Sequence, residues 1–166
     1  MNKTDIWTVL VVLALILSAC EPSATQGNMA SDGRIRLSVK NSYAEFGDYV
    51  VHVNAMTTAG LTPEVARTYD IVRSEERALI NLVILQKSPG IGAGTPVTGA
   101  VQAQAANLTG QMKAIELREI VDGDSIYYIA QVSVDDRETI NFDFDIRPAG
   151  TSRNLPVRYS HQFYTR

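Results

Sequence analysis

The sequence contains one cysteine and two histidines in 166 residues. A single cysteine cannot form an intrachain disulfide, nor can it supply the several thiolates of a cysteine-based zinc site. The two histidines, His52 and His161, lie far apart along the chain, which argues against a histidine-rich metal centre. We therefore expect a domain that is held together by packing alone and that needs no metal or other cofactor.

Positive charge is also scarce. Because 15 lysines and arginines stand against 18 aspartates and glutamates, the formal net charge is −3. A nucleic-acid-binding protein needs a basic surface that neutralises phosphates, so the composition argues against this class. Apolar residues, in contrast, make up 45% of the chain, which is enough to build the core of one globular domain.

A largely apolar run of 12 residues, IWTVLVVLALIL, occupies positions 6–17. A membrane-spanning helix needs about 20 apolar residues, whereas the hydrophobic part of a signal peptide needs about 7–15. The run ends in Leu17-Ser18-Ala19-Cys20, which resembles the bacterial lipobox, whose cysteine is acylated and becomes the new N-terminus. We predict a lipoprotein signal peptide over 1–19 and lipidation of Cys20. The alternative is an ordinary buried cysteine that follows a signal anchor.

The residues after Cys20 predict where the exported chain resides. Glu21 differs from the aspartate that favours retention in the inner membrane, so we expect an outer-membrane lipoprotein that faces the periplasm. Its contact with the membrane would be through N-terminal acyl chains. Residues 20–33 contain Pro, Ser, Thr, Asn and Gly without apolar periodicity, which predicts a flexible tether before a domain over 34–166.

From Arg34 onward, apolar residues recur mainly with a period of two, as expected for half-buried strands. The segment 79–85 is instead apolar on both faces apart from Asn81, which is typical of a central strand. The predicted strands cover about 35–39, 49–54, 79–85, 97–105, 112–120, 126–134, 140–146 and 157–164.

About eight short strands with turn residues between them predict an all-β fold, namely an antiparallel β-sandwich of immunoglobulin or fibronectin type. A small barrel is the alternative. One short helical insertion interrupts the strands, since Thr62 can cap a helix, Pro63 suits its first position and Glu64 complements its positive end. Val65, Ala66, Tyr69 and Ile71 could then pack on the sandwich.

Several stretches of the predicted domain also carry a family resemblance. They are 46–49 (FGDY) with His52 and Asn54, 61–66 (LTPEVA) running into Tyr69 and 71–74 (IVRS), 123–128 (GDSIYY) and 162–164 (QFY). Together they resemble the proteobacterial domain-of-unknown-function family 4426 (DUF4426), over about residues 34–166. The resemblance implies a secreted all-β domain and brings no established activity. Members of this family often have a plain cleavable signal, so the lipobox is a departure.

Five polar residues are candidates for a binding patch: Asp48, His52, Asn54, Glu64 and Arg73. The strand period puts His52 and Asn54 on one face, beside the predicted helical insertion. The alternative role for these residues is hydrogen bonding that fixes the insertion to the sheet.

Other polar clusters fit structural roles better than functional ones. The segment 90–94 (GIGAG) lacks a following helix that could receive a phosphate, so we expect a mobile hairpin loop. The carboxylates of Asp135, Asp136, Asp143 and Asp145 lack the spacing of a calcium-binding loop and are predicted to be solvated. His161 is predicted to lie in or at the rim of the core, and no Gly-x-Ser-x-Gly elbow indicates a hydrolase.

The sequence therefore favours a non-enzymatic binding or interaction module, whose partner could be another envelope protein. Two other functions stay open. One is an envelope enzyme or metal-dependent protein that uses Asp48, His52 and Glu64. The other is a carrier of a small ligand with a pocket between the sheets.

Overall fold

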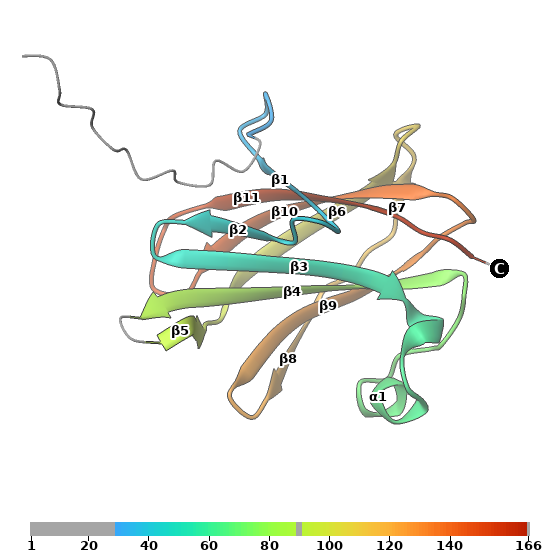
Figure 1. Ribbon diagram of the computed structural model, residues 1–166, viewed down its shortest axis with the longest axis horizontal. Helices are drawn as coiled ribbons and strands as arrows, with labels where there is room; N and C mark the ends of the chain where they lie inside the picture. Colours follow the sequence, from blue (N-terminus) through green and yellow to red (C-terminus); the bar gives the residue numbers. More distant parts are fainter. Residues whose placement is uncertain (1–28, 89–90, 166) are drawn as a thin grey trace, which may run out of the picture.

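The computed structural model describes residues 29–88 and 91–165, which form a β-sandwich (Figure 1). The predicted signal peptide, Cys20 and the tether up to residue 28 lie outside the described residues. The strands are β1 (Ile35–Ser38), β2 (Tyr43–Phe46), β3 (Tyr49–Thr57), β4 (Arg77–Ser88), β5 (Ile91–Pro96), β6 (Gly99–Asn107), β7 (Met112–Lys113), β8 (Arg118–Asp122), β9 (Ser125–Ser133), β10 (Thr139–Pro148) and β11 (Leu155–Gln162). Between β3 and β4 lie the 3-10 turn η1 (Thr58–Gly60) and the helix α1 (Pro63–Thr68).

The strands form two sheets that pack face to face. The five-stranded sheet has the order β1-β11-β10-β6-β7. The six-stranded sheet has the order β2-β3-β4-β9-β8, with β5 paired to β4. The named pairings are antiparallel except that of β1 with β11. The predicted all-β sandwich with a short helical insertion is thus confirmed.

The described residues contain eleven strands rather than about eight. The sequence pattern did not reveal some of the short strands, and it joined others into one. The predicted strand 112–120 is two strands, β7 in one sheet and β8 in the other. Ile115 and Leu117 lie where the chain crosses between the sheets, and both pack against the core. The alternation of apolar and polar residues therefore continues through the crossing, although the residues that cross pair with no neighbouring strand.

The glycine-rich segment is part of a strand rather than a loop. Residues 91–96 form β5, which pairs with β4 through Leu85↔Pro96 and Gln86↔Thr95. The predicted hairpin is present, but its second arm begins at Ile91. Gly94 has φ +78°, and a Cβ there would lie 2.7 Å from the carbonyl oxygen of Gln86. Only glycine allows the two backbones to approach so closely.

The core between the sheets is built by the alternation that the sequence displays. On β10, Ile140, Phe142, Phe144 and Ile146 are fully buried, and the residues between them are partly exposed. The ring centroids of Phe142 and Tyr159 are 6.4 Å apart across β10 and β11. From the opposite sheet, alternate residues of β3 and β4 complete this core, namely Val51, Val53, Ala55, Ala78, Ile80, Leu82 and Ile84.

Helix α1 begins and ends as its residues dictate. The backbone N–H of Val65 donates to Thr62 Oγ1 at 3.3 Å, and Pro63 occupies the first turn. At the other end, the N–H groups of Asp70 and Ile71 donate to the carbonyls of Arg67 and Ala66. This is a Schellman arrangement in which Asp70 takes the left-handed conformation, with φ +52°.

Two of the aspartates predicted to be solvated are in ion pairs instead. Asp145 Oδ2 accepts a hydrogen bond from Arg34 at 2.8 Å, and Asp143 accepts two from Arg158, at 2.6 and 2.8 Å. The Arg34 hydrogen bond lowers the pKa of Asp145. Because Arg158 also lies 3.5 Å from Asp32, these pairs attach the turn before β1 to the five-stranded sheet.

In the part of the chain that the structure describes, no helix has both the length and the apolar character needed to cross a membrane.

Candidate functional site

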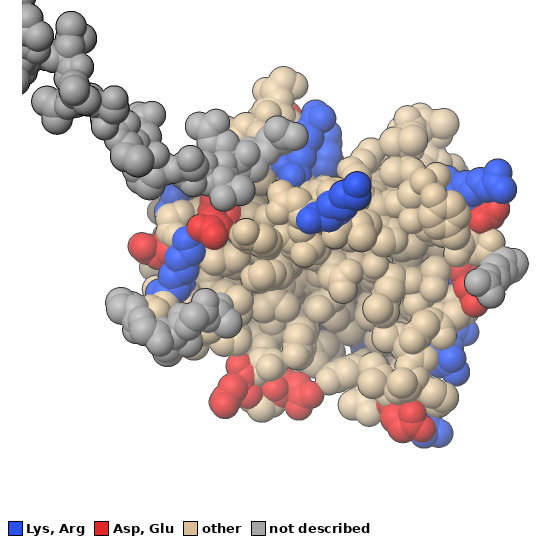
Figure 2. Space-filling view, in the orientation of Figure 1, with Lys and Arg blue, Asp and Glu red and all other residues tan. Residues whose placement is uncertain are grey.

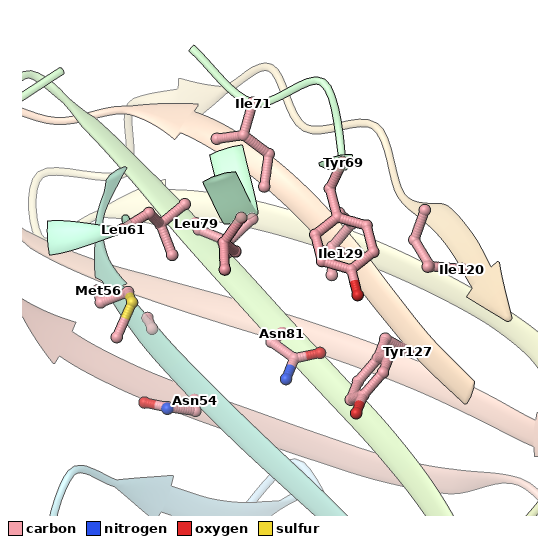
Figure 3. Close-up of a pocket in the computed structure, with 12 residues that line it drawn as sticks. Asn54, Met56, Leu61, Tyr69, Ile71, Leu79, Asn81, Ile120, Tyr127 and Ile129 are labelled. Atoms are coloured by element: carbon pink, nitrogen blue, oxygen red, sulfur yellow. The ribbon is translucent and has the colours of Figure 1, made fainter. Parts of the chain in front are cut away.

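A cleft of about 300 Å³ lies on the outer face of the six-stranded sheet, beside α1 (Figure 3). One side is formed by β3, β4, β8 and β9, and the other by the segment 58–74, which contains η1 and α1. The residues that line it are Asn54, Ala55, Met56, Leu61, Val65, Tyr69, Ile71, Leu79, Asn81, Ile120, Tyr127 and Ile129. A pocket between the sheets was predicted for a ligand carrier, whereas this cleft lies outside the sandwich.

The sheet side of the cleft follows from strand register. Asn54 of β3 pairs with Asn81 of β4, which in turn pairs with Ile129 of β9. Alternate residues of a strand share one face. The side chains of Asn54, Asn81 and Ile129 therefore point outward, as do those of Met56 and Leu79. The apolar character of β4 on both faces therefore supplies a second, smaller apolar surface outside the core.

The segment 58–74 is held over the sheet by the buried hydroxyl of Thr58. Thr58 Oγ1 donates to the carbonyl of Val72 at 2.9 Å and accepts from the N–H of Ser74 at 2.9 Å. The N–H of Ala59 donates to the carbonyl of Ser74 at 3.2 Å. These bonds join the two ends of the segment at a residue that is 0% exposed.

A second set of contacts joins the segment to the edge strand β8. The guanidinium of Arg118 donates to the carbonyl of Tyr69 at 2.7 Å, and the Tyr69 hydroxyl donates to Asp122 at 2.8 Å. The hydrogen bond to the Asp122 carboxylate raises the pKa of Tyr69, because ionisation would break it. Ala66 and Ile71 pack against Ile129, which completes the contact of the segment with the sheet.

The cleft and the surface around it carry few charges. None of the twelve lining residues is an Asp, Glu, Lys, Arg or His. The outward positions of the three central strands likewise contain no Asp, Glu, Lys or Arg. This holds for residues 50–56 of β3, 79–85 of β4 and 127–133 of β9. Figure 2 shows an uncharged surface that extends over the middle of β3 and β4.

Two amide side chains on this face are unusual. The Oδ1 atom of Asn81 is buried and has no hydrogen-bond partner among the described residues. The same is true of Gln131 Oε1, which lies outside the cleft. In Figure 3, Asn81 lies between Asn54 and Tyr127 on the sheet side of the cleft. A buried acceptor without a donor is destabilising, and most such groups in proteins are paired.

Of the five residues of the predicted patch, His52 and Asn54 lie together on the outward face of β3, as the strand period predicts, but Asp48, Glu64 and Arg73 are not brought to them. Asp48 precedes β3, about 20 Å from Asn54 along an extended strand. Glu64 is exposed on α1 and accepts a hydrogen bond from Arg67 at 3.5 Å, while Arg73 donates to the carbonyl of Ala59 at 2.9 Å. Of the five, Asn54 lines the cleft.

The histidines have neighbours that are mainly aromatic. His52 points outward from β3 and its ring centroid lies 5.6 Å from that of Tyr43. His161 is half-buried, with Nδ1 3.2 Å from the Tyr159 hydroxyl and its ring 4.4 Å from that of Phe163. Partial burial lowers the pKa of both histidines. Within the described ranges, no three His, Cys, Asp or Glu side chains are grouped so that they could hold a metal ion.

The cleft residues Leu61, Ile120 and Tyr127 were not identified from the sequence. Tyr69 and Ile71 were predicted to pack on the sandwich, and Ile71 is indeed buried. The signal that pointed to this face was the apolar character of 79–85 at both strand faces. It indicated that something covers β4 on the outside, but it did not identify which segment.

The family comparison agrees with the resemblance noted in the sequence. The model of DUF4426, a domain of unknown function, matches residues 43–166. No curated protein matches the chain.

Solved structures share the fold. A DUF4426 family protein from Pseudomonas aeruginosa PAO1 is 30% identical with a TM-score of 0.63, and the match covers 75% of this chain and 94% of that chain. FetP of uropathogenic Escherichia coli strain F11 is 11% identical with a TM-score of 0.53, covering 75% and 93%. A copper-bound variant of the same FetP is 14% identical with a TM-score of 0.54, covering 75% and 95%. The likeness to FetP concerns the fold alone.

Proposed function

The chain belongs to the DUF4426 family, and we propose that it is a non-enzymatic binding module of the bacterial envelope. In this proposal, acylation of Cys20 anchors the protein in the outer membrane, and the domain faces the periplasm. The lipobox-like sequence Leu17-Ser18-Ala19-Cys20 and the following Glu21 support the location. The outer face of the six-stranded sheet, with its cleft, is the proposed binding surface.

The uncharged outer face of β3, β4 and β9 is the observation that supports a binding role. An antiparallel sheet that faces water normally presents polar side chains on that side. Here the outward positions include Val83 and Leu85, which are partly exposed, and Met56 in the cleft is 42% exposed. Apolar surface of this kind, rimmed by polar residues, is typical of sites that bind a partner or ligand.

Photo-crosslinking in intact cells tests this surface. A benzophenone amino acid at Met56 would project from the proposed face, whereas the same group at Gln102 would project from the outer face of the five-stranded sheet. Both residues are exposed, so they form a matched pair. We expect a discrete adduct from position 56 and none from position 102. Equal adducts from both positions, or none from position 56, would contradict the proposal.

Lipid labelling tests the anchor separately. Cells that express the protein are grown with a radioactive fatty acid, beside cells that express Cys20→Ala. We expect label in the wild-type protein only, and loss of the variant from the outer-membrane fraction. An unlabelled wild-type protein, or a variant that stays in the outer membrane, is the contrary result.

The metal-dependent alternative gains no support from the geometry. Asp48, His52 and Glu64 do not converge, although the fold is shared with a copper-bound FetP variant. At 14% identity, that variant's copper provides no argument for a metal site in this chain.

A further inference from the structure

We propose that the cleft beside α1 binds a small neutral molecule with an apolar body and one amide group, which pairs with the side chain of Asn81. This inference rests on the proposed binding function and adds the class of ligand. Its basis is the size of the cleft, the absence of charge in its lining, and the unpaired amide oxygen on its sheet side.

The volume sets the size of the ligand. Small-molecule sites in proteins start at about 300 Å³, which is the volume found here. One water molecule takes about 30 Å³ in the liquid, so the cleft accommodates roughly ten non-hydrogen atoms. An eight-carbon chain with an amide end has this size.

The lining sets the charge of the ligand. A carboxylate or ammonium group that enters the cleft loses water, and no oppositely charged side chain among the twelve lining residues replaces it. The guanidinium of Arg118, beside the lining residue Tyr69, is already bonded to the carbonyl of that residue. A neutral ligand avoids this cost.

Asn81 sets the position of the polar group. Its Oδ1 atom has no donor and no exposed surface in this structure, so a ligand N–H reaches it once the amide turns about its Cβ–Cγ bond, and then satisfies an acceptor that the protein leaves unpaired. A ligand amide offers a donor and an acceptor together, and therefore matches a side-chain amide at both atoms. Asn54, directly opposite on β3, presents a second amide beside it (Figure 3).

The apolar body has surfaces on both sides of the cleft. Leu79 and Ile129 come from the sheet, and Leu61 and Ile71 come from the segment 58–74 (Figure 3). The rings of Tyr69 and Tyr127 add two flat walls. Burial between these groups provides the hydrophobic contribution to binding, while the amide fixes the orientation.

Titration with octanamide and octanoate tests the inference. The two probes have the same chain length, but at neutral pH only octanamide is uncharged and has N–H donors. Each is added to the chain from residue 21 onward, exported behind a cleavable signal peptide in place of residues 1–20 so that detergent is not needed, and binding is followed by NMR. We expect shifts at the side-chain amides of Asn81 and Asn54, and at least tenfold tighter binding of octanamide.

Two variants separate the amide pair from general hydrophobic binding. Asn81→Leu keeps the size of the side chain but removes its amide, and it should abolish the preference for octanamide. Gln131→Leu removes the other buried, unpaired amide oxygen, which lies outside the cleft, and should leave the preference unchanged.

The inference is wrong if octanoate binds as tightly as octanamide, if neither binds, or if Asn81→Leu keeps the wild-type preference. Failure of the titration together with a discrete adduct from position 56 would reject this ligand class and leave the binding function standing. Failure of both experiments would reject both.

Discussion

At the scale of single residues, Tyr128 connects the two sheets. It lies on β9 and is 4% exposed, and its hydroxyl accepts a hydrogen bond from the N–H of Gly99 on β6 at 2.7 Å. The same hydroxyl lies 2.6 Å from Glu119 on β8, to which it donates. Burial and the hydrogen bond to Glu119 raise the pKa of Tyr128 to about 12.

This raised pKa predicts a loss of stability at alkaline pH. An unfolded tyrosine ionises near pH 10, so the stabilisation is complete below pH 10 and is lost as the pH rises towards 12. Between pH 9 and 11, the wild-type protein should lose about 1 kcal/mol more free energy of unfolding than Tyr128→Phe. Urea unfolding at both pH values measures this, and equal losses would contradict the assignment.

At the scale of elements, the segment 58–74 depends on one buried hydroxyl. Thr58 Oγ1 bonds to Val72 and Ser74, and the neighbouring Thr57 makes no side-chain hydrogen bond within the described residues. Thr58→Val keeps the shape of the side chain and removes these bonds.

We expect Thr58→Val to lower the free energy of opening of this segment by about 1–3 kcal/mol, since it leaves buried groups unpaired. Hydrogen exchange at the N–H of Ile71, which donates to the carbonyl of Ala66, reports the opening. Thr57→Val is the matched control and should exchange as the wild-type protein does. Unchanged exchange in Thr58→Val would mean that the hydroxyl does not hold the segment.

Elements with strong local signals were predictable from the sequence. The cap Thr62, Pro63 in the first turn and the alternation of 140–146 each specify a conformation through adjacent residues. The strand β2 was not found, because its four residues, YAEF, do not alternate apolar with polar, and β7 was merged with β8, because two residues show no period of their own. The cleft was also not found, because its two sides come from distant parts of the chain. Leu61 lies on the segment 58–74, which folds back over the sheet, whereas Tyr127 is positioned by the pairing of β9 with β4.

At the scale of the whole molecule, the sandwich is held by its apolar core. Phe142 is 0% exposed and packs beside Phe144 and Tyr159, with ring centroids 6.4 Å away in each case. Because the chain has one cysteine, no intrachain disulfide supports this packing.

Phe142→Ala should therefore lower the free energy of unfolding by about 3–5 kcal/mol, through lost burial and the cavity left behind. Gln104→Ala, at an exposed position of the paired strand β6, should change it by less than about 0.5 kcal/mol. Chemical denaturation of both variants checks the difference. A small loss for Phe142→Ala would mean that the two sheets do not pack through this face.

The central claim is that the outer face of the six-stranded sheet is occupied in the cell and that the opposite face is free. It is tested by the rate at which a neutral maleimide labels Met56→Cys and Gln102→Cys, in intact envelopes and in purified protein. We predict that Met56→Cys reacts at least tenfold more slowly in the envelope than when purified, whereas Gln102→Cys reacts equally fast in both. Equal rates for Met56→Cys in envelope and purified protein would contradict the account.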